Sequence, residues 1–289
     1  MNLKHLHYNF HSEPTRDSGV VSYLMRFRMT DNSNQRQNMH LMVISDNPEL
    51  SEYLIQLLNR LPGRDDIVFQ LFYSAKNQHP GVMKKLGATP INLKDPVSLE
   101  NIILKANLVI SLHCKQIFPE RLVNAVTCIN IHPGLNPFNR GWFPQIFSII
   151  NKKPAGVTVH LMDSDVDHGP VLFQAPVDIL QSDTSLDVYR RIITMEKTLL
   201  EQHLADIIAG NYSTVRLSSE GNYNSIRDFE TLCELDLNAT GTLQEHLDLL
   251  RALTHGELRN AFFRDEQGRK YYVRLNFEAD NASSEYNND

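Results

Sequence analysis

The feature of the sequence that most constrains its fold is a regular alternation, between residues 40 and 131, of short apolar runs and amphipathic segments. The apolar runs predict buried strands at 40–45, 67–73, 90–93, 107–112 and 127–131, with helices between them. Strands and helices alternate in this way in open, mostly parallel sheets that carry helices on both faces. We therefore predict an α/β, Rossmann-like fold, whose ligands bind beyond the carboxyl ends of the strands.

The second half of the chain predicts further strands, a long helix and a small module. Strands are expected at 156–162 and 171–179, and a helix capped by Thr184 or Ser185 should end at Gly210. In the module, residues 226–237 alternate as in a strand, a capping box at Thr242 opens a helix, and 260–264 and 270–277 form a hairpin. The predicted divisions are a catalytic domain at 39–211, a connector at 212–225 and a C-terminal helix-plus-hairpin module at 226–277.

Composition and charge exclude several classes of protein. A net charge of −6 over 289 residues argues against a nucleic-acid partner, which normally requires a basic surface. No apolar run reaches membrane-spanning length, and the first 38 residues lack the apolar centre of a signal peptide. The three cysteines show neither a disulfide framework nor metal-ligand spacing, which fits a cytoplasmic location. We expect residues 1–38 to be a poorly ordered extension and residues 278–289 to be a frayed tail.

Two polar motifs follow predicted strands. The first is Asn130-Ile131-His132-Pro133-Gly134, and the second is Val166-Asp167-His168-Gly169-Pro170. Residues two apart in a strand point to the same face, so the Asn130 amide and the His132 imidazole should lie side by side at an exposed strand end. Each residue alone is equally well explained as a turn residue. An amide, an imidazole and a carboxylate together predict a site for acyl or proton transfer.

The two motifs, with His160 seven residues before Asp167, resemble the signature of the folate-dependent formyltransferases. The segments 111–116, 136–145 and 250–256 are similar to the nucleotide-sugar N-formyltransferases, especially those that act on dTDP-4-amino-4,6-dideoxyglucose. This resemblance implies N10-formyltetrahydrofolate as the formyl donor and a formamido sugar for surface polysaccharide (O-antigen) as the product. It also implies that Asn130, His132 and Asp167 are catalytic. Asn130 and His132 should face the oxyanion, and Asp167 should take the amine proton, directly or through water, and hold His132 in a useful protonation state.

The resemblance further implies where the two substrates bind. The folate should contact Gln116, Ile117 and Phe118 on one segment, and Asp163 and Val166 on the loop before Asp167. The nucleotide sugar should contact four other residues: His113, Lys115, Arg140 and Trp142. Cationic side chains suit a diphosphate, and the single Trp could stack on a base or fill a gap in the core. No metal is required by this chemistry.

Other functions share parts of this pattern. A dTDP-3-amino sugar or methionyl-tRNA could be the acceptor, although a tRNA enzyme needs a larger and more basic C-terminal domain. A glycinamide ribonucleotide transformylase would normally lack the module, and a formyltetrahydrofolate hydrolase would share the three catalytic residues. From another class, the chain could be a nucleotide-sugar-binding subunit without catalytic activity.

The predicted hairpin keeps one aromatic face that its own module cannot bury. This exposed face predicts a homodimer that forms through the module.

Overall fold

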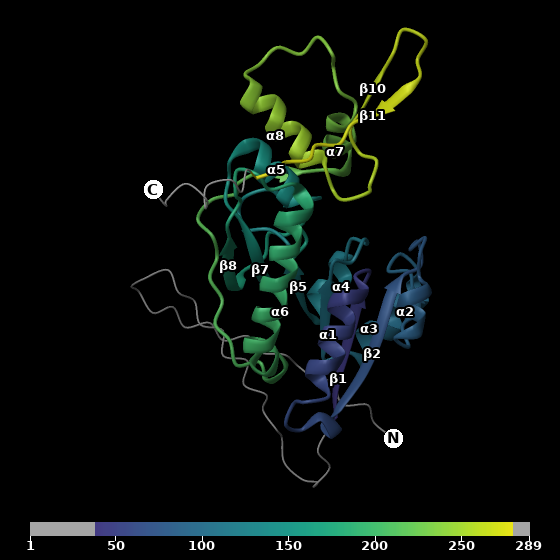
Figure 1. Cartoon of the computed structure of the whole chain (residues 1–289). Helices are drawn as coiled ribbons and strands as arrows, with labels where there is room; N and C mark the ends of the chain where they lie inside the picture. The colour runs from purple at the N-terminus through teal and green to yellow at the C-terminus, as the bar shows by residue number, and fades with distance from the viewer. Residues whose placement is uncertain (1–37, 280–289) are drawn as a thin grey trace, which may run out of the picture.

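The computed structural model describes residues 38–279, and a seven-stranded sheet forms its centre (Figure 1). The strands are β1 (Met39–Ser45), β2 (Ile67–Ser74), β3 (Thr89–Ile91), β4 (Leu108–Leu112), β5 (Thr127–His132), β7 (Ala155–Leu161) and β8 (Val171–Val177). Their order in the sheet is β3-β2-β1-β4-β5-β7-β8. The first five are parallel, and β7 and β8 extend the sheet in antiparallel fashion. The predicted α/β, mostly parallel fold is confirmed.

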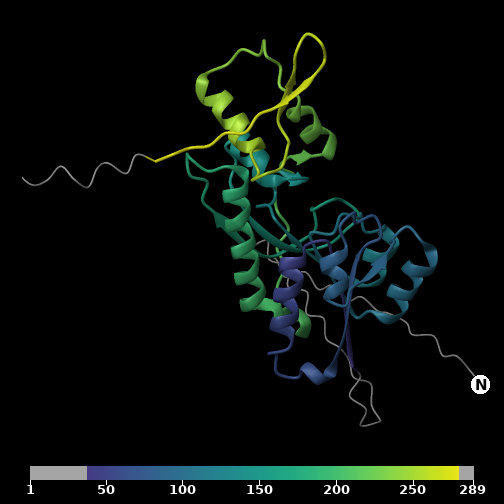
Figure 2. The same ribbon diagram turned by 45° about the vertical axis from the view of Figure 1, so that its right-hand side comes forward.

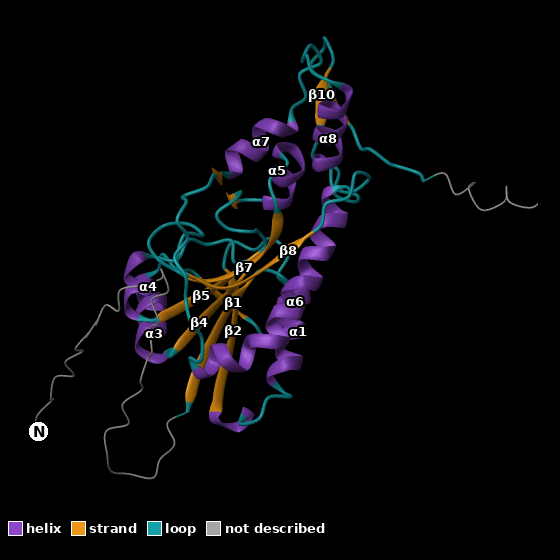
Figure 3. Cartoon of the chain, turned by 90° about the vertical axis from the view of Figure 1, so that its left-hand side faces the viewer, coloured by secondary structure: helices purple, strands orange, loops and turns teal. Residues whose placement is uncertain are grey.

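Helices cover both faces of the sheet (Figure 3). They are α1 (Pro48–Leu58), α2 (Gly81–Lys85), α3 (Pro96–Lys105), α4 (Glu120–Ala125), α5 (Pro144–Asn151) and α6 (Ser185–Ala209). Strand β1 shows why both faces need cover, because its side chains alternate between two cores. Leu41 and Val43 pack with α1, α5 and α6, whereas Met42 and Ile44 pack with α3 and α4. The short apolar runs of the sequence are therefore strands that are buried on both sides.

Parallel pairing brings the ends of β1, β4 and β5 to the same edge of the sheet. Leu112 at the end of β4 pairs with Ile131, one residue before His132 ends β5. At the end of β1, Asn47 caps the start of α1, and its side-chain oxygen accepts from the Leu50 amide at 3.0 Å. Three short polar segments thus leave the sheet at one place, which is where the site forms.

The C-terminal module comprises α7 (Ile226–Cys233), α8 (Leu243–Leu253), β10 (Phe262–Arg264) and β11 (Lys270–Tyr272), and it lies beyond one end of the sheet (Figure 2). The strand predicted at 226–237 is wrong, since most of that segment is helix α7. Ser225 and Asp228 form a reciprocal capping box at its start, and Phe229 and Cys233 lie one turn apart on its packed side. Strand-like pairing begins only after the helix, where the Leu235 amide donates to the Phe262 carbonyl.

The connector predicted at 212–225 is more than a link between domains. Tyr223–Asn224 forms β9, which pairs in parallel with β6 (Arg140–Gly141), the segment just after the first motif. Val215 also bridges to Val171 at the start of β8. The module is held to the main domain by buried polar contacts as well, since the Arg251 guanidinium donates to the Asp183 carbonyl at 2.8 Å.

Among residues 38–279, no helix has both the length and the apolar character needed to cross a membrane. The predicted extension at 1–38 and the predicted tail at 278–289 lie almost entirely outside the described residues.

Candidate active site

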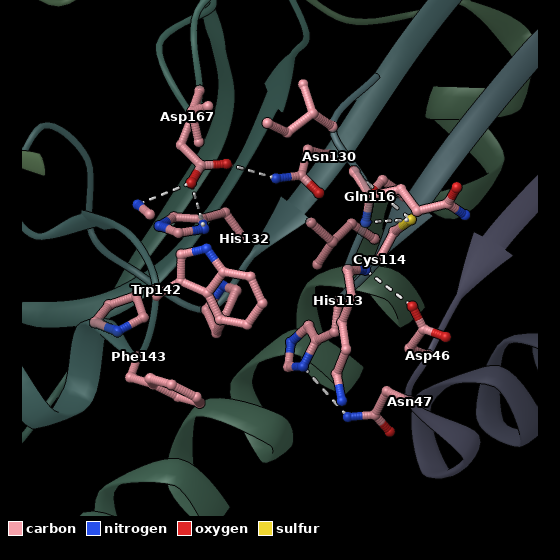
Figure 4. Close-up of a pocket in the computed structure, with 18 of the residues that line it drawn as sticks. Asp46, Asn47, His113, Cys114, Gln116, Asn130, His132, Trp142, Phe143 and Asp167 are labelled. Carbon is pink, nitrogen blue, oxygen red and sulfur yellow. Dashed lines mark hydrogen bonds and ion pairs between the residues drawn. The ribbon is translucent and has the colours of Figure 1, made fainter. Parts of the chain in front are cut away.

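A cavity of about 490 Å³ opens where β1, β4 and β5 end (Figure 4). One wall is formed by the segment after β4, a second by the ends of β5 and β7, and a third by the loop that carries Asp167. The fourth is largely aromatic and includes Trp142, Phe143, Tyr189, Phe229 and His255. Its position agrees with the general rule that ligands of open α/β sheets bind beyond the carboxyl ends of the strands.

Asp167 gathers the predicted catalytic residues around one carboxylate. Its Oδ1 accepts a hydrogen bond from the Asn130 amide nitrogen at 2.9 Å, and its Oδ2 accepts from the Gly141 backbone amide at 3.0 Å. The Nδ1 atom of His132 lies 3.3 Å from the same Oδ2. Asp167 adopts a left-handed backbone conformation (φ 52°), and its own carbonyl accepts from the Asn136 side chain at 2.7 Å. The structure therefore brings together all three residues that the motifs predicted.

The charges of this group follow from burial and from proximity. Burial by itself raises the pKa of Asp167, but the His132 imidazole, His160 and the Gly141 amide outweigh it and hold that pKa well below its usual range. Burial lowers the pKa of His132 to about 4, against the opposing effect of Asp167. Near neutral pH the carboxylate is ionised and the imidazole is neutral. The expectation of exposed side chains is wrong, since His132 is only 3% exposed.

The proton on neutral His132 can be placed. A carboxylate oxygen next to Nδ1 requires that nitrogen to carry the proton, so Nε2 has a free lone pair. Nε2 is buried and has no hydrogen-bond partner within residues 38–279. A buried polar atom without a partner is uncommon and calls for an explanation. In a cavity wall, an unpaired basic nitrogen is suited to accept a proton from a bound molecule.

Gly134 leaves room for this imidazole. A Cβ atom built on Gly134 would lie 2.4 Å from Nε2 of His132 and 2.9 Å from its Cδ2. A side chain at this position would push the ring away from Asp167. The glycine of Asn-Ile-His-Pro-Gly is therefore required by the position of the ring, and not by a positive φ.

The residues predicted to contact folate all line the cavity, in different ways. The side chain of Ile117 is 72% exposed, and Val166 is also exposed, so both present apolar surface at the rim. The Gln116 amide is occupied, because it donates to the Ile91 carbonyl and accepts from the Leu93 amide. Phe118 is buried, and the Asp163 carboxylate is bonded to His168 at 2.9 Å. The Gln116 side chain is therefore not free for a ligand, whereas the Phe118 ring and the partly exposed Asp163 carboxylate can still contact one.

Three of the four residues predicted to contact the nucleotide sugar line the cavity, namely His113, Lys115 and Trp142. Arg140 does not line it. The Arg140 guanidinium donates to the Val166 carbonyl at 3.3 Å and lies 3.7 Å from Glu220, behind the Asp167 loop. In this position Arg140 supports the loop.

Part of the site comes from elements that the two sequence motifs do not reveal. Tyr189 belongs to α6, Phe229 to α7, and His255 follows α8. Phe229 lies in the segment that was predicted to be a strand. The capping box at Ser225 and the helical spacing of the apolar residues after it were the available signals.

A second imidazole in the cavity wall also meets a buried carboxylate. His113, which has a left-handed backbone (φ 50°), places Nε2 2.8 Å from Oε1 of Glu196 in the middle of α6. Its Nδ1 lies 3.4 Å from the side-chain nitrogen of Asn47, which also donates to the Tyr189 hydroxyl at 3.0 Å. Burial raises the pKa of Glu196, and the neighbouring His113 opposes that rise. Sequence analysis did not identify Glu196.

Comparisons with known proteins agree with the fold and the site. Residues 31–204 match the Formyl transferase family, and residues 228–279 match the N-formyltransferase dimerization C-terminal domain. A sugar N-formyltransferase from a Shewanella species is 49% identical with a TM-score of 0.81, covering 83% of this chain and 98% of its own. A 4-N formyltransferase from Francisella tularensis is 40% identical with a TM-score of 0.78, at the same coverage. The dTDP-4-amino-4,6-dideoxyglucose formyltransferase of Mycobacterium tuberculosis is 40% identical over 237 residues, which are 82% of this chain and 96% of that protein.

An amide, an imidazole and a carboxylate at the end of an α/β sheet are suited to an enzyme that transfers a chemical group. The match to the Formyl transferase family identifies that group as formyl. The chain belongs to the formyltransferase family. The enzyme class predicted from its sequence, an N-formyltransferase, is confirmed.

Proposed function

We propose that this enzyme transfers a formyl group from N10-formyltetrahydrofolate to the amino group of dTDP-4-amino-4,6-dideoxyglucose, for surface polysaccharide biosynthesis. The acceptor is inferred from the M. tuberculosis relative of that name and from the 4-N formyltransferase of F. tularensis. The donor is inferred from the resemblance carried by Asn130, His132 and Asp167. The observation that carries the proposal is His132 in the cavity wall, whose Nδ1 faces an ionised Asp167 and whose Nε2 has no hydrogen-bond partner among residues 38–279.

The positions of these groups support direct attack by the amine. The acceptor nitrogen forms a bond to the formyl carbon, and its N–H becomes acidic as that bond forms. The lone pair on Nε2 of His132 then accepts the proton, and Asp167 stabilises the imidazolium through Nδ1. The same proton can pass to the folate nitrogen as the C–N10 bond breaks, so the protons balance. A positioned acid or base of this kind contributes about 10²–10⁴-fold in rate.

This assignment differs from the sequence prediction, in which Asp167 takes the proton. A carboxylate whose pKa is held below its usual range is a weak base, and both of its oxygens already accept hydrogen bonds. Asp167 therefore serves to orient His132 and to stabilise its charge. Asn130 gives one amide hydrogen to Asp167, and its nitrogen also lies 3.4 Å from Nε2 of His160. Donation of the second hydrogen to the formyl oxygen requires that this longer contact gives way as negative charge develops on that oxygen. One such donor contributes about 3–4 kcal/mol to the transition state.

The rest of the cavity fits two substrates that approach the three catalytic residues from different sides. Ile117 and Val166 offer apolar surface on the side predicted for the pterin. Lys115 supplies a cation and Trp142 an aromatic ring for a nucleoside diphosphate. Arg140 is not part of this proposal for the diphosphate, because its guanidinium is bonded to the loop that carries Asp167.

The decisive experiment is an acceptor panel with N10-formyltetrahydrofolate and purified enzyme. The panel contains dTDP-4-amino-4,6-dideoxyglucose, its galacto isomer, a dTDP-3-amino sugar, methionyl-tRNA and no acceptor. Formamido sugar should form fastest with the first compound and should be detected by mass spectrometry. Formate release without an acceptor at the same rate would identify a hydrolase and overturn the proposal, and a preference for any other acceptor would overturn the assignment of the sugar.

We also propose that the enzyme is a homodimer formed through the C-terminal module. Phe263 stacks on Tyr271 with ring centroids 5.4 Å apart, on the hairpin face opposite to Phe262 and Tyr272. Tyr271 is 43% exposed, and the hairpin projects from the end of the molecule (Figure 1). An exposed aromatic pair on a projecting hairpin is typical of a contact surface.

Light scattering tests the dimer. The wild-type enzyme should have about twice the chain mass of 33.1 kDa. Tyr271→Asp should shift it toward the monomer, because a charge would have to be buried in the interface. Leu104→Asp is the matched control, since Leu104 is 73% exposed on α3, outside the module. A monomer mass for the wild-type enzyme at tens of micromolar would rule out the dimer.

A further inference from the structure

Glu196 interrupts the apolar side of α6. Its neighbours on that side, Ile192, Ile193, Leu199 and Leu200, are buried core residues, and Glu196 is itself 0% exposed. One carboxylate oxygen contacts His113, and the other is buried with no hydrogen-bond partner among the described residues. A carboxylate in such a position costs several kcal/mol of desolvation, which a purely structural apolar residue would avoid. A specific role for Glu196 in the adjacent cavity would account for it.

The hydrogen bonds around Glu196 fix the state of His113. Asn47 must direct its oxygen to the Leu50 amide, because that bond caps α1, so its nitrogen faces His113. An amide nitrogen is only a donor, and Nδ1 of His113 must therefore be the acceptor. The proton of the neutral ring is consequently on Nε2 and is donated to Glu196 at 2.8 Å. This conclusion holds whether or not the free oxygen of Glu196 carries a proton.

Both nitrogens of His113 are thus used within the protein, although the residue lines the cavity. Only carbon atoms of the ring remain to face a bound molecule. Tyr189, whose ring centroid lies 6.1 Å from that of His113, and Trp142 line the same cavity. His113 is accordingly part of an aromatic surface and is not a polar ligand or a proton carrier.

We propose that Glu196 is a positioning residue for the acceptor, which holds the His113 ring so that its carbon surface contacts the apolar side of a deoxygenated sugar. His113 follows β4 at the level where His132 ends β5, so the two rings lie on adjacent strand ends. The part of the acceptor next to His113 is therefore the sugar that carries the reacting amine. In dTDP-4-amino-4,6-dideoxyglucose, carbon 6 is a methyl group in place of a hydroxymethyl group, and a methyl group favours an apolar contact. This inference rests on the proposed function and adds the residues that select the sugar.

Four variants and a control test the proposal. Glu196→Leu removes the acceptor of the Nε2 proton and fits the apolar side of α6, whereas Glu196→Gln keeps an oxygen for that proton. Each of His113→Phe and His113→Ala is combined with Glu196→Leu, so that no buried carboxylate is left unpaired. Glu201→Gln is the matched control, because it makes the same chemical change on α6, where Glu201 bonds to Tyr53 away from the cavity.

Two measurements are made on each protein. NMR of ¹⁵N-histidine-labelled enzyme reports the tautomer of His113, whose signal is identified by its loss in the double variant that carries His113→Phe. Steady-state kinetics report KM and kcat for dTDP-4-amino-4,6-dideoxyglucose. Wild-type enzyme and Glu196→Gln should both carry the proton on Nε2. Glu196→Leu keeps the Asn47 donor at Nδ1 and should keep this tautomer, but its Nε2 proton has lost the acceptor that holds the ring. In Glu196→Leu the KM for the acceptor should rise about tenfold or more, while kcat stays within about threefold of wild type. In Glu196→Gln and in the Glu201→Gln control, both KM and kcat should stay within about threefold of wild type.

The two double variants separate an aromatic contact from a nitrogen contact. The double variant with His113→Phe should have a KM at least about tenfold lower than the one with His113→Ala, because only the former keeps a ring. Equal KM values for the two double variants, a proton on Nδ1 in the wild-type enzyme, or an effect of Glu196→Leu on kcat alone would overturn the proposal. The tautomer measurement needs no acceptor. If the wild-type enzyme formylates no sugar, the proposed function is wrong, and the tautomer of His113 can still be measured separately.

Discussion

Two carboxylate–imidazole pairs meet the same cavity, and they leave their imidazoles in opposite conditions. In the Asp167–His132 pair, the carboxylate faces Nδ1, and Nε2 has no partner among the described residues. In the Glu196–His113 pair, the carboxylate faces Nε2, and Asn47 occupies Nδ1. An imidazole with one free nitrogen can transfer a proton, whereas an imidazole with no free nitrogen can offer a ligand only the carbon atoms of its ring. Both imidazoles have a carboxylate partner, so the carboxylate does not distinguish a proton carrier from an apolar contact surface. The distinction depends on whether the second ring nitrogen has a hydrogen-bond partner.

The largest effect should come from removing the charge of the first pair. In Asp167→Asn, the new side chain cannot accept from both Asn130 and Gly141, and it no longer stabilises an imidazolium. We expect kcat to fall by about 10²–10⁴-fold. Product formation under saturating substrates measures this, and a thermal melt within a few degrees of wild type shows that the fold is kept. Near wild-type turnover would remove Asp167 from the mechanism, and the same test applies to His132→Asn.

The low pKa of His132 gives the second prediction. The folded pKa is about 4 and the unfolded value is about 6.5, so between these pH values the unfolded state binds a proton that the folded state does not. Stability therefore falls as the pH is lowered from 6.5 to 4. Asp167 contributes only below this window, because its pKa in the folded state is lowered from 3.8.

Urea unfolding at pH 7 and pH 4.5 measures this loss. His132→Asn should lose less stability than wild type over that interval, by roughly 2–3 kcal/mol. The comparison between the two proteins cancels the contribution of the other histidines. Parallel loss in both would show that His132 is not the buried neutral group described above.

Gly134→Ala should move the first imidazole without changing its chemistry. The new methyl group would lie 2.4 Å from Nε2 of His132, and the end of a side chain yields more readily than backbone. We expect a loss of kcat on the order of 10- to 100-fold, since small misplacements of reacting groups are costly, with little change in melting temperature. Gly81→Ala is the control, because no atom lies within 4 Å of a Cβ built there. An active Gly134→Ala enzyme would mean that the position of the ring is not critical.

The sequence predicted the first pair better than the second for physical reasons. Asn130 and His132 share a face because strand spacing is two, and the resemblance supplied Asp167. Glu196 could have been suspected, because it occupies a position of α6 where helical spacing requires an apolar residue. Its partner could not, since nothing in a sequence shows that residue 196 lies against residue 113 in the fold.

The same distinction applies to the fold. Apolar runs that are buried on both sides identified the strands of the sheet. A cap at Thr184 or Ser185 marked the start of α6, and a capping box at Thr242 marked the start of α8. The segment at 226–237 was predicted to be a strand from its alternating apolar residues, whereas the capping box at Ser225 marks the start of helix α7. The pairing of β6 with β9 could not be predicted, because each contributes only two residues from a loop.

The smallest effect should come from Asn47→Asp, which changes the group that faces Nδ1 of His113 and the Tyr189 hydroxyl. Aspartate caps helices as well as asparagine does, so the start of α1 should be kept, with a stability change below about 1 kcal/mol. The amide donor becomes a carboxylate acceptor, and Nδ1 must then carry a proton. His113 would become an imidazolium between two carboxylates, which the ¹⁵N shifts of its ring would report directly.

Asn47→Ser, which keeps a cap but removes the donor, is the control. We expect the acceptor KM to rise by about threefold in the Asp variant, since the ring stays in place while its charge changes. An Asp variant whose His113 remains neutral would show that Asn47 does not set the tautomer, and the contrast between the two imidazoles would then need another cause.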